Sequence, residues 1–241
     1  VSKRTKVYEA IFGEKELYRL IKISGIHIHI DQSKDRVVDQ FNFLTSFRPT
    51  IALTSTSGIS HQRINGVNCH RYKLISDPVG GVFSKIPEDR NYISSIEELK
   101  ERDLERYEKW KKEFLRNSIL SEEFFLENFQ PENTGYPDIR YRPDIGVGTL
   151  EMRANDTAPL DIVLGQAALV LYGVNRLLNE DIKISYSNSN IYKFEEKEII
   201  LPKETTLDHY TNLAINNGLK DEEVKNYLSS LINFSIEYAP K

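Results

Sequence analysis

The chain has 241 residues, of which 39% are hydrophobic and 28% charged, so it can bury a sizeable core and wholesale disorder is excluded. Its formal net charge of −4 argues against a nucleic-acid partner, because phosphate binding normally shows as a basic excess. Cys69 is the only cysteine, which excludes an intrachain disulfide and a cysteine-based zinc cluster. No apolar run approaches the roughly 18 residues that cross a bilayer, and no signal-peptide pattern opens the chain. We therefore expect a cytoplasmic protein without a membrane partner.

Periodicity and capping residues predict two helices around one strand in the first part of the chain. The first helix spans 4–22, with Gly13 weakening its middle, and the second spans 34–47, with Ser33 as its cap. Between them, residues 23–31 alternate apolar and polar side chains, which is typical of a strand with one buried and one polar face.

The rest of the chain is predicted to alternate loops, helices and short strands. Residues 55–90 are rich in Gly, Ser, Asn and Pro and are expected to form a long loop with short strands. Ser95 and Glu98 form a capping box, which predicts a charged helix to about residue 116. The later predictions are a short helix after Ser121, strands at 138–142 and 148–154, an apolar helix over 159–178 capped by Asp156 or Thr157, and two helices within 200–241.

These elements predict an α+β fold with a largely antiparallel sheet, and nothing in the sequence marks a boundary inside it. We therefore expect a single domain over residues 1–241. The apolar helix over 159–178 is expected to be the most buried one, with Leu171 in the core.

Two histidines are the sharpest local feature. His27 and His29 share the polar face of the first strand, so both imidazoles can reach one metal ion. The alternative is a pair of surface or hydrogen-bonded histidines with no metal. Sequence alone leaves both interpretations open.

A glutamate and several arginines form the second set of candidates. Glu151 and Arg153 share a strand face. They could form a structural ion pair, or Glu151 could bind Mg²⁺ while Arg153 faces a transferring phosphate. Each arginine taken singly is more often a solvated surface residue. Together they predict an anion pocket, because guanidinium groups bind carboxylate and phosphate oxygens bidentately. The other arginines in this set are Arg63, Arg71, Arg140 and Arg142.

The order of these features resembles the second glutamate–cysteine ligase family, which includes the carboxylate–amine ligases. The resemblance covers roughly residues 4–180 and is carried by the His-x-His strand together with the Gly-Thr-Leu-Glu-x-Arg strand. The matching segments are Ser24-Gly25-Ile26-His27-Ile28-His29, Ala52-Leu53-Thr54-Ser55, Asp138-Ile139-Arg140, and Gly148-Thr149-Leu150-Glu151-Met152-Arg153 followed by Asp156.

The resemblance implies a glutamine-synthetase-like fold, in which helices flank a curved, mainly antiparallel sheet. It implies ATP and Mg²⁺ as cofactors, amino acids as substrates, an acyl-phosphate intermediate and a part in glutathione biosynthesis. Glu151 would be a metal ligand, with His27 at the ATP–metal site and His29 beside it. Arg153 and Arg140 would act on the transferring phosphate or the substrate, and Arg71 and Arg63 would help to bind the cofactor.

One departure from the family leaves several alternatives. Family members begin with a strand bearing a Gly-x-Glu-x-Glu motif, whereas here only 26 residues precede His27, and Gly13-Glu14-Lys15-Glu16 is a shifted echo in a helical context. We expect a longer protein, a complementary N-terminal chain or a homo-oligomer to complete the site. The alternatives are a non-catalytic relative that binds a nucleotide or an amino acid, and a hydrolase with zinc on His27 and His29.

Overall fold

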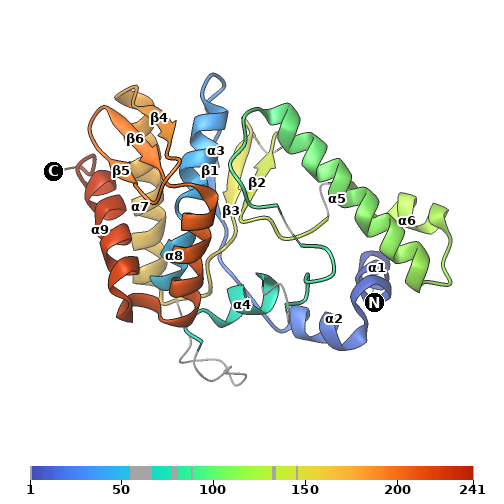
Figure 1. Ribbon diagram of the computed structural model, residues 1–241. Coiled ribbons are helices and arrows are strands. Elements are labelled where there is room, and N and C mark those ends of the chain that lie inside the picture. Colours follow the sequence, from blue (N-terminus) through green and yellow to red (C-terminus); the bar gives the residue numbers. More distant parts are fainter. Residues whose placement is uncertain are drawn as a thin grey trace. The chain divides into compact units, whose positions relative to one another are not determined.

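The computed structural model of the protein describes residues 2–54, 67–76, 81–87, 89–131, 134–144 and 146–240. These residues combine helices with two small sheets, which confirms the predicted α+β class (Figure 1). They form two compact units that are interleaved along the chain. Unit 1 comprises Val1–Ser24, Lys73–Asp89 and Ser94–Pro137, and unit 2 comprises Gly25–Tyr72, Arg90–Ile93 and Asp138–Lys241. Because each unit is built from separate stretches, no single point in the sequence marks a border between them.

Unit 1 is helical and is held together by aromatic side chains. Its helices are α1 (Lys3–Phe12), α2 (Glu14–Ile21), α5 (Ile96–Asn117) and α6 (Glu122–Asn128). The helix predicted over 4–22 is divided at Gly13, whose φ of +88° is strained for any residue with a side chain. Trp110 is fully buried and its ring contacts those of Tyr8, Phe12, Phe83 and Phe129.

The predicted helix starts in unit 1 are confirmed. The side chain of Ser95 accepts a hydrogen bond from the main-chain N–H of Glu98 at 3.0 Å, and Ser121 caps α6 in the same way. These hydrogen bonds satisfy N–H groups that have no partner inside the helix, so the capping signals in the sequence were sufficient to place both helices.

Unit 2 contains the sheet on which the candidate residues lie. Its strands are β1 (Ile28–Asp31), β2 (Ile139–Arg142) and β3 (Thr149–Met152). They pair in the order β1-β3-β2, with both pairs antiparallel. The predicted alternation is confirmed in β1, where Ile28 and Ile30 are buried while His29 and Asp31 are exposed.

The other elements of unit 2 are mostly helices. They are α3 (Val37–Thr45), the 3-10 helix η1 (Arg48–Ala52), α7 (Leu160–Asn179), α8 (Glu204–Asn216), the 3-10 helix η3 (Gly218–Lys220) and α9 (Glu222–Ile236). The helix α4 (His70–Ser76) begins in unit 2. The second sheet, which the sequence did not predict, has the order β4-β6-β5, with β4 (Lys183–Tyr186) parallel and β5 (Lys193–Phe194) antiparallel to β6 (Glu198–Leu201) (Figure 1).

Three local predictions are wrong. Part of the predicted loop over 55–90 is the helix α4. The cap position of α3 is Arg36 rather than Ser33, and that of α7 is Pro159 rather than Asp156 or Thr157. Around the first of these helices, the main-chain N–H of Ser33 donates to Gln40 Oε1 at 2.9 Å.

The helix α7 is less buried than its composition predicts. Leu171, expected in the core, is 43% exposed, and Leu160 and Leu164 are exposed on the same helix. The buried side is formed by Leu169, Val170, Val174 and Leu177. Among the described residues, α7 is long and apolar enough to cross a membrane. Core helices of other proteins meet the same criterion of length and composition, and 39% of the most apolar 18-residue stretch of α7 is buried.

Candidate functional site

The polar face of β1-β3-β2 brings together the candidates that the sequence placed on separate strands. Residues directly opposite each other in an antiparallel pair point to the same side of the sheet. His29 lies opposite Glu151 on one side of β3, and Arg140 lies opposite Glu151 on the other. Glu151 is therefore in the centre of the face, flanked by a residue of each neighbouring strand.

The carboxylate of Glu151 is buried and surrounded by cationic side chains. Its side chain is 4% exposed, and His27 Nδ1 donates to Oε1 across 2.6 Å. Arg153 Nε lies 3.4 Å from the same oxygen. The second oxygen, Oε2, is 3.8 Å from Arg140 Nη1 and 3.7 Å from Arg142 Nη1. His27 and Glu151, which the resemblance places at one ATP–metal site, are therefore in direct contact.

These neighbours keep Glu151 charged. Burial alone would raise the pKa of its carboxyl group, but the hydrogen bond from His27 and the charges of Arg153 and Arg140 outweigh it and hold the pKa at about 2. Arg153, Arg140 and Arg142 each place a guanidinium nitrogen within 3.8 Å of this one carboxylate. Guanidinium groups gathered in this way are the donors that proteins use to bind phosphate and carboxylate oxygens.

Arg142 already shows how this face holds a carboxylate. Its Nε and Nη2 donate to the two oxygens of Asp144 at 3.0 and 2.9 Å, which is the bidentate geometry expected of a guanidinium and a carboxylate. The hydrogen bonds from Arg142 lower the pKa of Asp144 to about 2. Asp144 itself is largely exposed at the turn after β2.

The described donors do not fit a resident metal ion. No three His, Cys, Asp or Glu side chains of the described residues come together as ligands. Neither His27, whose Nδ1 lies 2.6 Å from Glu151, nor His29, whose Nδ1 lies 3.1 Å from Thr149 Oγ1, belongs to such a group of described residues. Mg²⁺ prefers oxygen ligands, and Glu151 is surrounded by guanidinium groups that repel a cation.

Two further candidates lie away from Glu151 or outside the description. Arg63 is outside the described residues. Arg71 is only 6% exposed, and its Nη1 donates to the main-chain carbonyls of Arg153, Ala154 and Asn155 at 3.0, 3.2 and 3.4 Å. At least one end of this guanidinium is thus engaged by the backbone that follows β3.

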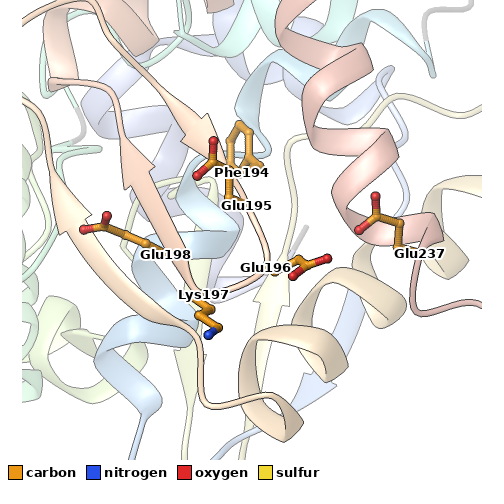
Figure 2. A pocket seen from close by; sticks show the side chains of 6 residues that line it. All are labelled: Phe194, Glu195, Glu196, Lys197, Glu198 and Glu237. Carbon is orange, nitrogen blue, oxygen red and sulfur yellow. The ribbon is translucent and has the colours of Figure 1, made fainter.

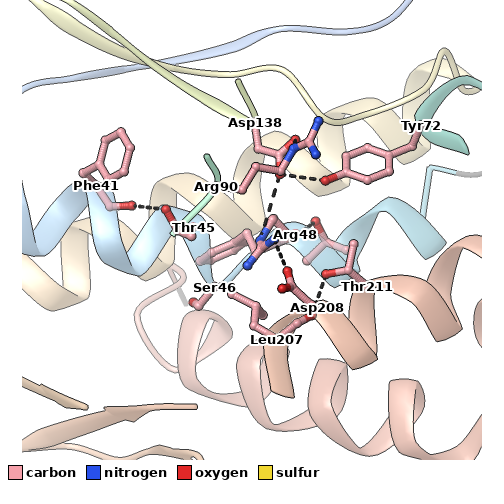
Figure 3. Close-up of polar contacts among 12 residues, drawn as sticks. Phe41, Thr45, Ser46, Arg48, Tyr72, Arg90, Asp138, Leu207, Asp208 and Thr211 are labelled. Atoms are coloured by element: carbon pink, nitrogen blue, oxygen red, sulfur yellow. Dashed lines mark hydrogen bonds and ion pairs between the residues drawn. The ribbon is translucent and has the colours of Figure 1, made fainter. Parts of the chain in front are cut away.

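Sequence reasoning missed a buried polar network next to this sheet (Figure 3). Arg48 is 2% exposed; its Nη1 lies 2.7 Å from Asp208 Oδ1 and its Nε 4.0 Å from Asp138. Asp138 also accepts a hydrogen bond from the Tyr72 hydroxyl at 2.7 Å and lies 3.3 Å from Arg90 Nε. Burial alone would lower the pKa of Arg48, but Tyr72, Asp138 and Asp208 raise it, so the arginine stays protonated.

This network has a direct connection to the candidate site. The main-chain carbonyl of Asp138 accepts a hydrogen bond from the N–H of Arg153 at 2.8 Å. Asp138 comes immediately before β2 and thus helps to fix the end of β3 from which Arg153 projects. The only sequence signal for it was the place of Asp138 in a segment that resembles the ligase family.

A hollow on the second sheet is acidic and contains none of the predicted residues. Its volume is about 570 Å³, and it is lined by Phe194, Glu195, Glu196, Lys197, Glu198 and Glu237 (Figure 2). Three of its carboxylates are bound by the protein itself: Glu198 accepts from Ser185 at 2.9 Å, Glu195 pairs with Lys193 at 2.8 Å and Glu237 pairs with Arg176. The polar face around Glu151 is therefore the better candidate for a functional site.

Comparison with known proteins does not assign this site. No protein-family model matches the chain, and no curated protein or solved structure is significantly similar to it.

Proposed function

We propose that this chain is an ATP-dependent carboxylate–amine ligase of the glutamate–cysteine ligase type, with a glutamine-synthetase-like sheet. The observation that carries the proposal is the buried carboxylate of Glu151 in contact with His27 and Arg153, with Arg140 3.8 Å away. These residues belong to the segments on which the resemblance to that ligase family rests. The antiparallel order β1-β3-β2 supports the same assignment.

The chemistry needs a cationic surface of this kind. A carboxylate is a poor electrophile, so one of its oxygens first attacks the γ-phosphorus of ATP, and the bond from that phosphorus to the bridging oxygen breaks with its electron pair leaving on ADP. The amine nitrogen then attacks the acyl carbon, phosphate departs with the electrons of the carbon–oxygen bond, and the nitrogen loses a proton. In the first step two anions must approach each other, which Arg140 and Arg153 would make possible by neutralising charge.

Glu151 has a positioning part in this scheme. Its carboxylate holds His27 and Arg153 at one oxygen and attracts Arg140 and Arg142 at the other. The guanidinium groups are thereby arranged before a substrate binds, which reduces the cost of ordering them during the reaction. The described donors do not fit a resident Mg²⁺, so ATP would carry any Mg²⁺ on its own phosphates.

A second candidate function is a non-catalytic relative that binds a nucleotide or an amino acid. The observation that favours it is that, among the described residues, Glu151 belongs to no group of three His, Cys, Asp or Glu side chains that could hold a metal ion. A second copy or a complementary chain that supplies such a group would restore the ligase assignment. A zinc hydrolase has less support, because His27 and His29 belong to no group of three possible ligands among the described residues.

The test follows ADP release with ATP, Mg²⁺, glutamate and a panel of amines that includes cysteine. We expect ADP release that depends on the amine, and we expect Glu151→Gln to abolish it. The control Glu196→Gln changes an exposed glutamate between β5 and β6 and should leave ADP release unchanged. The assay is repeated over a range of protein concentrations, since a site completed by a second copy gains specific activity with concentration. Binding of ATP without turnover at any concentration would favour the binding protein, and turnover that is independent of Glu151 would refute the ligase site.

A further inference from the structure

Arg71 connects the two backbone segments from which the site residues project. Its Nη1 is within 3.4 Å of the carbonyl oxygens of Arg153, Ala154 and Asn155, so one guanidinium fixes the chain immediately after β3. On its other side it packs on Gly25, two residues before His27. A Cβ atom at Gly25 would lie 2.5 Å from Arg71 Cζ, so this position requires glycine as long as the guanidinium stays in place.

The same two segments also bond each other directly. Gly25 and Asp156 form an antiparallel bridge, and the N–H of Ile26 donates to the carbonyl of Asn155 at 3.2 Å. Burial raises the pKa of Asp156, and the charge and main-chain N–H of Arg71 oppose that rise. Gly25 leaves the room that the Arg71 guanidinium needs beside these segments.

From this arrangement we infer that Arg71 is a positioning residue, which sets the backbone from which His27 and Arg153 reach Glu151. The inference rests on the proposed function. The resemblance implies that Arg71 binds the cofactor, whereas here it positions the residues that form the site. The two groups that contact Glu151 Oε1 come from the two segments that Arg71 joins. A shift of either segment would open the contacts of 2.6 and 3.4 Å on which the charge arrangement depends.

A matched pair of arginines allows the inference to be tested. Arg176 on α7 is buried like Arg71, its Nη1 donates to the main-chain carbonyl of Phe234 at 2.7 Å, and its ion pairs are with Glu180 and Glu237. Arg71→Met and Arg176→Met therefore both remove a buried guanidinium from main-chain carbonyls. Gly25→Ala adds a third variant, which displaces the Arg71 side chain while leaving its charge in the protein.

Two measurements are made on each variant after circular dichroism has shown that it is folded. The first is the NMR signal of the His27 ring, identified with a His27→Gln variant, and the second is the affinity for ATP with Mg²⁺ by calorimetry. We expect Arg71→Met and Gly25→Ala to move the His27 signal towards that of a solvated imidazole and to weaken ATP binding by about tenfold or more. Arg176→Met should leave both unchanged, and Arg71→Lys should recover part of the loss.

The inference is overturned if Arg71→Met and Gly25→Ala keep the wild-type His27 signal and the wild-type affinity. It is equally overturned if Arg176→Met changes both to the same extent, because the effect would then be general loss of stability. If the unmodified protein does not bind ATP, the proposed function fails, and the His27 signal alone decides on Arg71. Should Arg71→Met not fold, Gly25→Ala and Arg71→Lys carry the test.

Discussion

Replacing Glu151 by glutamine tests how its carboxylate is held in the folded protein. The carboxyl group has a pKa of about 2, against an ordinary value of 4.5, because His27 and the neighbouring arginines favour its charged form more than burial disfavours it. This difference corresponds to about 3 kcal/mol of stability when the carboxylate is ionised in both the folded and the unfolded chain. Removing one partner of a buried ion pair costs a similar amount, about 3–5 kcal/mol.

The contribution of Glu151 has a defined dependence on pH. Because the pKa is lowered by folding, the stabilisation is fully present above about 4.5 and is lost as the pH falls through about 2. Glutamine resembles the protonated form in shape and charge. We therefore expect Glu151→Gln to cost about 3 kcal/mol at pH 7 and only about 1 kcal/mol at pH 3.

Urea unfolding of the wild-type protein and the variant at both pH values measures this difference, with the exposed Glu196→Gln as control. The control should change the free energy of unfolding by less than about 0.5 kcal/mol. A cost for Glu151→Gln below that limit at pH 7, or an equal cost at pH 7 and pH 3, would refute the electrostatic account of this site.

Three further predictions concern packing and burial. Leu171→Ala should cost less than about 1 kcal/mol in denaturant melts because Leu171 is 43% exposed, whereas Leu177→Ala on the buried side of α7 should cost about 2–5 kcal/mol. Trp110→Ala should cost about 3–5 kcal/mol, since the ring is fully buried; a smaller loss would mean that unit 1 repacks. Burial raises the pKa of Asp156 to about 6 in spite of Arg71, so wild-type stability should fall as the pH rises from about 4 to about 6, and thermal melts of Asp156→Asn should lack this fall.

Patterns that act locally were predicted well from the sequence. The alternation in residues 23–31 separates Ile28 and Ile30 from His29, and this fixed the side of the strand on which a polar site could form. Ser95 was predicted as a helix cap and a helix was predicted after Ser121, and each hydroxyl bonds an N–H only three residues away. The pairing of β1 with β3, which are separated by more than a hundred residues, had no local signal in the sequence.

Features that depend on distant contacts could not be predicted. Arg48 is buried because Asp208, 160 residues later, lies 2.7 Å from its guanidinium, and nothing near Arg48 indicates that partner. The composition of α7 predicts that it packs against other elements, but not which side they cover, so Leu171 was placed in the core incorrectly. The strands β4 and β5 are short and carry several exposed side chains, so the alternation of apolar and polar residues is weak there.

The contacts of Glu151 are unequal, and this inequality indicates which side of the site a ligand would use. Oε1 is held at 2.6 Å by His27, whereas Oε2 is 3.7 and 3.8 Å from its nearest guanidinium nitrogens. Arg142 additionally bonds the exposed Asp144, so its guanidinium already divides its contacts between two carboxylates. An incoming anion needs short contacts to guanidinium groups and gains most from those that Glu151 holds loosely. We therefore expect a phosphate or carboxylate to draw Arg140 and Arg142 away from Oε2, while the contacts at Oε1 stay in place and preserve the geometry of the site.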